Sequence, residues 1–224
     1  MTREAFQKAL EESPFTAVGE IVYKFLYDSI VTMDIQPGTT LNETKLAKEM
    51  GISRTPIRSA IDRLEADGLV GQEKGKAAVV LPLNSDEYYQ IVELRAAIET
   101  QAAASAAKQI SEADLLSLKK IVLDMEKRDR SENPYPVNDT MFHEIVIYST
   151  HNPFLISAYD LYKAKMLRYR WFIHQNIPLS DYSHCIRVNV HRGIYNALKN
   201  RMSFQAREEA HEDAVMMRNT VLQL

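Results

Sequence analysis

The spacing of hydrophobic positions in the first fifty residues predicts a helix, a turn and a second, shorter helix. Apolar residues recur about once per helical turn over 17–35, and Pro37–Gly38 then gives a strong turn signal. Asn42 is a good N-cap for the shorter helix, and Gly51 suits the left-handed position after its end. The inner face of this helix is formed by Leu46 and Met50.

A third helix follows at once and opens on the residues SRTP. Ser53 is its candidate N-cap, Pro56 lies in its first turn, and Gly68 ends it. Its inner face is formed by Ile57, Ile61 and Leu64. Two short helices joined by a tight turn, with a longer helix before them, predict a helix-turn-helix arrangement.

The hydrophobic period changes after this helix. Two short apolar runs, Leu69–Val70 and Ala78–Leu81, flank a polar segment, which predicts a small two-stranded β-hairpin. The tip of the hairpin carries Lys74, Gly75 and Lys76. Three helices followed by such a hairpin wing make a winged helix-turn-helix, so we expect residues 1–83 to form this domain, with a short N-terminal extension.

From residue 84 onward the pattern is helical throughout, and Gly193 is the only glycine. Segments with a 3.6-residue period alternate with short breakers that place proline near a helix start. Short connections favour antiparallel neighbours, so the chain is predicted to be mainly α, with residues 84–224 forming an all-α six-helix antiparallel bundle. The predicted helices are 85–108, 111–131, 134–151, 153–175, 180–200 and 203–223.

Composition adds little to this division. The net charge is only −3, so any surface for a polyanion must be local rather than global. The one cysteine, Cys185, excludes an intramolecular disulfide and fits a reducing compartment. No apolar run is long enough to span a bilayer and the first residues lack a signal core, so we expect a cytoplasmic protein without a membrane partner.

The third helix carries candidate DNA contacts at its N-terminus. Arg54 and Arg58 lie four residues apart, hence on one face, and Ser53 and Thr55 add hydroxyl groups beside them. A recognition helix enters the major groove with these positions nearest the base edges, where arginine binds guanine or phosphate. The alternative is a solvated helix face on which Arg58 pairs with Asp62.

The hairpin tip favours the DNA-binding interpretation. Lys74 and Lys76 place two cations beside the bare backbone of Gly75, an arrangement suited to close approach to a minor groove or a phosphate. Glu73 adjoins Lys74 and lowers the net positive charge of this wing. We expect Lys74 and Gly75 to contact DNA.

The segment IQPGTTLNETKLAKEMGISRTPIRSAIDRLEADGLV resembles the DNA-binding domain of the GntR family, whose pattern also runs through PG, LA, SRTP and GLV. The resemblance covers about residues 17–83 and implies a dimeric winged-helix transcription regulator that binds a short palindromic operator. It gives Arg54 and Arg58 the recognition-helix roles and places Lys74 and Gly75 at the wing tip. Some relatives carry arginine where this chain has Thr44, so one DNA contact differs.

The bundle contains candidate metal ligands. Asp139 and His143 lie four residues apart on one helix face, a spacing that allows both side chains to chelate one cation. His191 lies among apolar residues and is also predicted to face a core. The alternative is that Asp139 and His143 simply form a buried hydrogen bond and that His191 is an ordinary core histidine.

The bundle resembles the FCD ligand-binding domain over about residues 85–222, through ELRAAIE, DTMFHEIVIYSTHNP and HRGIYNAL. This resemblance implies that Asp139, His143 and His191 bind a divalent transition metal, zinc first, with nickel or manganese as alternatives. For the fourth ligand we favour His211 on residue chemistry, with Asp213, which lies on the inward stripe, as the alternative. Six helices favour the VanR-like branch of the family.

Together these patterns predict a homodimeric transcription regulator, which we expect to be a repressor, controlled by a small carboxylate effector at or near the metal. Arg95 is the candidate effector-binding cation, and a surface ion pair with Glu99 is its alternative role. A metal-dependent hydrolase fused to a small helical module is the competing function. No HExxH general base is present and no catalytic residue is predicted, so we expect that the protein is not an enzyme.

Overall fold

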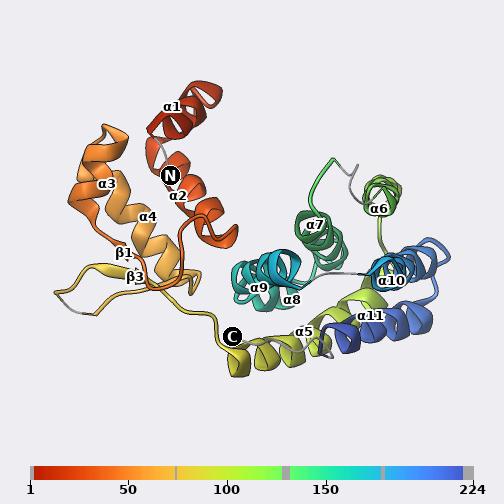
Figure 1. The fold of residues 1–224 in the computed structure, drawn as a ribbon. Helices are drawn as coiled ribbons and strands as arrows, with labels where there is room; N and C mark the ends of the chain where they lie inside the picture. Colours follow the sequence, from red (N-terminus) through yellow and green to blue (C-terminus); the bar gives the residue numbers. More distant parts are fainter. Residues whose placement is uncertain (1–2, 74, 128–131, 178–179, 219–224) are drawn as a thin grey trace. The chain divides into compact units, whose positions relative to one another are not determined.

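The computed structural model describes residues 3–73, 75–127, 132–177 and 180–218 (Figure 1). The chain divides into two compact units, Met1–Leu83 and Asn84–Leu224. Helices make up most of both units, and the few strands all belong to the first. In the described part of the chain, none of the helices is long and apolar enough to cross a membrane.

The N-terminal unit is a winged helix-turn-helix, as predicted. A three-stranded antiparallel sheet of order β1-β3-β2 packs with its helices, and Leu41 pairs with Ala78 while Val70 pairs with Val80. The sequence predicted only the β2–β3 hairpin, because a two-residue strand is too short to show an alternating pattern. The elements are α1 (Arg3–Glu12), α2 (Val18–Val31), β1 (Thr40–Leu41), α3 (Glu43–Met50), α4 (Arg54–Ala66), β2 (Val70–Gly71) and β3 (Ala78–Val80).

The turn between α3 and α4 forms for the predicted reasons. The Asn42 side chain accepts a hydrogen bond from the Lys45 N–H and so caps α3. Gly51 ends α3 in the left-handed region, with φ of 73°, where a side chain would be strained. Ser53 occupies the N-cap position of α4 without a side-chain capping bond, which leaves its hydroxyl available at the surface.

The N-terminal extension is not irregular, since most of it forms α1. Phe6 of this helix is fully buried and meets the Phe25 ring edge-on at 5.5 Å between centroids. Gln7 donates a hydrogen bond to the carbonyl of Met50 at the end of α3. The extension therefore belongs to the core of the helix-turn-helix unit.

The C-terminal unit is all-helical. Its longest helix, α5, lies alongside α11, while α7 packs against α6, α5 and α9 (Figure 1). Small residues, Ala102, Ala103 and Ala106 on α5 and Ala206 and Ala210 on α11, are buried and allow close packing of helices. The helices are α5 (Ser85–Ala106), α6 (Glu112–Glu126), α7 (Tyr135–Tyr148), α8 (Pro153–Asp160), α9 (Lys163–Asn176), α10 (Asp181–Lys199) and α11 (Ser203–Arg218).

The predicted count of six helices is wrong, because the described residues of this unit form seven. The segment 153–175 contains two helices, α8 and α9, separated at Leu161 and Tyr162. Leu161 is 77% exposed, whereas Tyr162 is buried and donates a hydrogen bond to the Glu99 carboxylate. A tertiary contact rather than proline or glycine accompanies this break, so the sequence carries no local signal for it. The VanR-like branch was favoured because six helices were predicted, and the structure does not support that count.

Candidate metal centre and nucleic-acid interface

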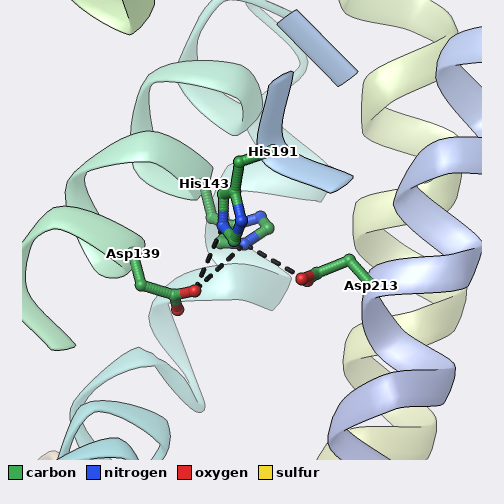
Figure 2. Close-up of side chains that lie close together, drawn as sticks. All are labelled: Asp139, His143, His191 and Asp213. Atoms are coloured by element: carbon green, nitrogen blue, oxygen red, sulfur yellow. Dashed lines mark ion pairs between the residues drawn. The ribbon is translucent and has the colours of Figure 1, made fainter. Parts of the chain in front are cut away.

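Four buried side chains from three helices converge in the bundle. Asp139 and His143 project from α7, His191 from α10 and Asp213 from α11 (Figure 2). One potential ligand atom of each lies within 4.8 Å of those of the other three. The four-residue spacing on α7 places its two side chains on one face, and the packing of α10 and α11 supplies the others.

The imidazole nitrogens face the carboxylates. His191 Nε2 lies 3.1 Å from Asp139 Oδ1, and His143 Nε2 lies 4.0 Å from the same oxygen. On the opposite side, His143 Nε2 lies 3.4 Å from Asp213 Oδ2. Figure 2 shows both rings between the two carboxylates. Two nitrogens and two carboxylate oxygens therefore surround one small volume.

Each histidine is held by its other ring nitrogen. The carbonyl oxygen of Arg187 lies 2.8 Å from His191 Nδ1, and a carbonyl can only accept, so Nδ1 carries the hydrogen. His191 Nε2 is buried and faces Asp139 Oδ1. The Glu99 carboxylate lies 2.9 Å from His143 Nδ1 and orients that ring in the same way. Metal-binding histidines are typically held like this, with Nε2 left for the cation.

Two buried arginines balance the carboxylates. Arg95 Nε donates to Glu99 Oε2 at 2.9 Å, and its guanidinium also forms an ion pair with Asp213. Arg170 forms an ion pair with Asp139. Arg95 Nη2 also lies 2.8 Å from His143 Nε2, so this guanidinium occupies one direction from which a cation reaches that nitrogen.

The charges of the cluster shift its ionisation. Burial opposes ionisation of Asp139, but Arg170 and the hydrogen bond from His191 outweigh it and hold the Asp139 pKa far below its usual value. Burial likewise disfavours charged His143, but Glu99 and Asp213 raise its pKa to about 9. Without another cation His143 therefore holds a proton at neutral pH, and metal binding at Nε2 must release it.

The structure decides between the two candidates for the fourth position. Asp213 is 4% exposed and lies in the cluster, whereas His211 is exposed and outside it. The preference for His211 is therefore wrong. The buried stripe of α11 runs through Ala206, Ala210 and Asp213, and a residue two positions earlier points to another face of the helix.

Arg95 and Glu99 form the predicted ion pair, but it is buried rather than on the surface, since Arg95 has no exposed area. The sequence did not predict that Glu99 contacts His143 or that Arg170 pairs with Asp139. The i,i+4 spacing of Arg95 and Glu99 was a usable signal for a buried pair. Arg170 had none, because it lies in a run of charged and aromatic residues whose inward face no local pattern reveals.

A small cavity adjoins the cluster. Asp139 and Asp213 line it together with Tyr135, Arg170 and Arg187, and its free volume is about 20 Å³. This volume accommodates about one water molecule. The remaining lining side chains are Ile173, His174, Met216 and Met217. Polar groups thus face the carboxylates, while the rest of the wall is largely apolar.

The N-terminal unit presents its arginines differently. Ser53, Arg54, Thr55 and Arg58 are all exposed at the start of α4. The Arg54 side chain remains 65% exposed although Nη2 lies 2.7 Å from a Glu43 carboxylate oxygen. Among the residues with described positions, no ion pair joins Arg58 to Asp62, the alternative considered above.

Arg63, further along α4, has an internal role instead. It forms an ion pair with Glu20 of α2, and its guanidinium lies 3.7 Å from the centroid of the Tyr23 ring. This arginine ties α4 to α2 and does not join the group at the helix start. The arginines of α4 therefore divide into two that face solvent and one that stabilises the unit.

The wing lies beside the start of α4. Arg54, Thr44, Gly75 and Lys76 line a groove of about 220 Å³ between the helices and the hairpin. Gly75 is exposed with φ of 80°, a conformation that favours glycine, whereas Lys74 lies outside the described residues. The neighbouring Lys76 forms an ion pair with Glu73. A helix N-terminus with two exposed arginines thus lies next to a groove that the wing lines through Gly75 and Lys76.

Comparisons with known proteins agree with this geometry. Residues 19–80 match the bacterial regulatory proteins of the gntR family, and residues 90–213 match the FCD domain. The HTH-type transcriptional regulator YdhC of Bacillus subtilis is 30% identical over 58% of this chain and 59% of its own. The gluconate operon transcriptional repressor of Bacillus licheniformis is 29% identical over 61% of this chain and 57% of its own. The chain thus spans less than two thirds of either relative.

Among solved structures, E. coli McbR/YncC superposes with a TM-score of 0.75, covering 90% of this chain and 95% of that one at 19% identity. That similarity shows a shared fold. A winged helix-turn-helix joined to a helical FCD domain defines a class of DNA-binding transcription regulator, not an enzyme. The chain belongs to the GntR family and carries an FCD domain.

Proposed function

We propose that this protein is a homodimeric repressor whose affinity for a palindromic operator is set by a small carboxylate bound at a divalent metal in the bundle. The observation that carries the proposal is the pair of oriented imidazole nitrogens, His143 Nε2 and His191 Nε2, buried between two carboxylates. As a bacterial DNA-binding regulator it acts in the cytoplasm.

The DNA-binding half of the proposal depends on the start of α4. Arg54 and Arg58 are exposed and one helical turn apart, so both can enter a major groove together. Ser53 and Thr55 offer hydroxyls to phosphates, and Lys74 and Gly75 follow as wing contacts. Two such helices related by dimer symmetry match a palindrome.

The four cluster residues suit a divalent transition metal. Asp139, His143, His191 and Asp213 offer two imidazoles and two carboxylates, a donor set that zinc, nickel and manganese all accept. Glu99 and the carbonyl of Arg187 fix the imidazole orientation. Arg95 must move away from His143 Nε2 as the cation enters.

The effector is proposed to be a small carboxylate. A metal with four protein ligands and an open position polarises and binds such a group. Arg95 is a buried guanidinium beside the cluster, and once displaced from His143 it can pair with the same anion. The name of the Bacillus licheniformis relative, a gluconate operon repressor, supports both an organic-acid signal and repression.

The proposed route from the cluster to the DNA-binding unit runs along α9. Arg170 contacts Asp139, and the adjacent Tyr169 exchanges hydrogen bonds of 3.1 and 2.9 Å with the backbone N–H and carbonyl of Asn84. Asn84 follows the last residue of the first unit. A shift of α9 caused by the ligand therefore moves the start of the bundle and changes the spacing of half-site contacts in a dimer.

The test is operator binding by the full-length protein, followed by fluorescence anisotropy, with the protein first stripped by a chelator and then reloaded with zinc. We expect reloading to change operator affinity in the native protein but not in the Asp139→Ala/His143→Ala double variant. Equal affinities of stripped and reloaded native protein would refute metal-linked control. Sedimentation of the same samples measures the dimer.

A further inference from the structure

We propose that the cavity beside the cluster binds a short dicarboxylate, with one carboxylate at the metal and the second held by Arg187. This inference rests on the proposed function and narrows its effector from a carboxylate to a dianion. It concerns a residue that neither the GntR nor the FCD resemblance assigned.

Arg187 differs from the other arginines around the cluster. It lines the cavity and is half-buried, yet it forms no hydrogen bond or ion pair through its side chain with any residue that the structure describes. Arg95 and Arg170, by contrast, each pair with carboxylates of the cluster. A half-buried guanidinium without an anion is costly unless a ligand supplies one.

The backbone fixes the position of Arg187 relative to the metal site. Its carbonyl accepts the hydrogen bond from His191 Nδ1, one helical turn later in α10. Side chains four residues apart lie on the same helix face, so Arg187 and His191 face the bundle interior together. The guanidinium therefore lines the same cavity as the two carboxylates, Asp139 and Asp213.

Charge balance favours a dianion. Glu99, Asp139 and Asp213 bring three negative charges, and Arg95 and Arg170 bring two positive ones. With both imidazoles neutral and a divalent metal bound, the cluster carries a single positive charge. Arg187 adds a second, so a ligand with two carboxylates neutralises the whole site, whereas a monocarboxylate leaves one buried cation unmatched.

The cavity limits the size of the ligand. Its free volume of about 20 Å³ excludes long acyl chains in this conformation. Because the cavity holds about one water molecule, any diacid must displace lining side chains, and Met216 and Met217 are suited to this because methionine changes conformation readily. The shortest diacids, of three or four carbons, need the smallest displacement.

The experiment compares diacids with monoacids of the same chain length by calorimetry on zinc-loaded, full-length protein: malonate with propionate, and succinate with butyrate. We expect the diacid to bind at least about tenfold more tightly, because its second carboxylate forms a charge-assisted hydrogen bond with Arg187. Arg187→Gln should remove that preference and leave monoacid affinity within about twofold of native. Arg187→Lys should restore part of it.

Arg192→Gln is the matched control. Arg192 lies on the same helix but pairs with Glu126 outside the cavity, so its removal should leave the diacid preference intact. Equal binding of diacids and monoacids by native protein, or an equal loss of both in Arg187→Gln, overturns the inference while leaving the metal site standing. A diacid preference that depends on Arg187 but persists in protein unable to hold zinc keeps the role of Arg187 and overturns the placement of the other carboxylate at the metal.

Discussion

The two units use arginine in opposite ways. At the start of α4, Arg54 and Arg58 are exposed, and within the described part of the chain only Arg54 pairs with a carboxylate, while its side chain stays largely exposed. In the bundle, Arg95 and Arg170 are buried and each is matched by carboxylates within the unit. The difference follows from solvation: water solvates the exposed guanidinium groups, so they remain available to a polyanion, whereas carboxylates beside Arg95 and Arg170 offset the cost of burying them.

The same residue type thus serves two purposes, recognition of an outside partner by exposed arginines and control of charge at an internal site by buried ones. The exposed arginines form a surface available to a partner outside the protein, and since the net charge of the chain is −3, any cationic surface has to be local. The buried arginines instead set the charge of a site that a cation or anion can disturb. Arg187 lies between these cases, half-buried and without a partner among the described residues.

The largest expected effect comes from removing the exposed pair. Arg54→Ala/Arg58→Ala should abolish specific operator binding, because each base contact is worth roughly 1–3 kcal/mol of discrimination. The thermal stability should remain close to native, since both side chains are exposed. Gel shifts against specific and scrambled DNA measure the change. Lys24→Ala on α2 is the control, and undiminished specificity in the double variant contradicts the role of α4.

Removing the buried cluster should abolish metal binding. Asp213→Ala and His191→Ala are each expected to lower bound metal strongly, because each removes a ligand from a preformed site. His211→Ala is the matched control on α11: its side chain is exposed, so metal content should not change. Elemental analysis of purified variants gives the answer. Loss of metal in His211→Ala with retention in Asp213→Ala would reverse the assignment.

A third prediction concerns the carboxylate that holds the start of α7. Asp124 accepts hydrogen bonds from the N–H groups of Glu132 and Asn133 and from the Asn138 side chain. Burial opposes its ionisation, but these bonds hold the Asp124 pKa well below the ordinary 3.8. Asp124→Asn should cost about 1–3 kcal/mol of unfolding free energy at neutral pH.

The sign of the pH dependence follows from that lowered pKa. The stabilisation by Asp124 is fully present above pH 3.8, the unfolded value, and is lost as the pH falls through the lower native pKa. The difference in melting temperature between native protein and Asp124→Asn should therefore narrow on acidification below about pH 4. A difference that stays constant between pH 7 and pH 3 shows that the charge of Asp124 contributes nothing.

The smallest effect is expected at the link between α9 and the start of the bundle. Tyr169→Phe removes hydrogen bonds to Asn84 and Glu87 and should cost about 1 kcal/mol of stability. Its diagnostic effect is on coupling, since zinc should change operator affinity less in this variant than in native protein. Tyr148→Phe, which removes hydrogen bonds to Asp160 and Lys163 but none to Asn84, is the control. If Tyr169→Phe lowers the stability but zinc changes operator affinity as much as in native protein, Tyr169 has a structural role only.

The sequence revealed local features better than tertiary ones. The cap at Asn42, the turn at Gly51 and the buried face of α4 follow from short-range chemistry, so periodicity and turn signals predicted them. The break between α8 and α9 did not follow, because the burial of Tyr162 against Glu99 depends on packing with another helix. Tertiary contacts of this kind leave no periodic trace.

The candidate site shows the same limit. The spacing of Asp139 and His143 predicted a shared face, and the inward stripe of α11 already pointed to Asp213. His211 was favoured instead because imidazole is a common metal ligand. On α11, however, the His211 side chain is exposed. Arg170 and Arg187 meet the cluster and its cavity only because α9 and α10 pack against α7 and α11, which no local pattern shows.

The central claim is that His143 and His191 bind a metal through Nε2, and anomalous diffraction from crystals of the protein purified with zinc tests it most directly. The account predicts an anomalous peak about 2.0–2.1 Å from both nitrogens, with Asp139 and Asp213 within bonding distance and Arg95 moved away from His143. No peak in the cluster, with Arg95 still against His143 Nε2, would contradict it.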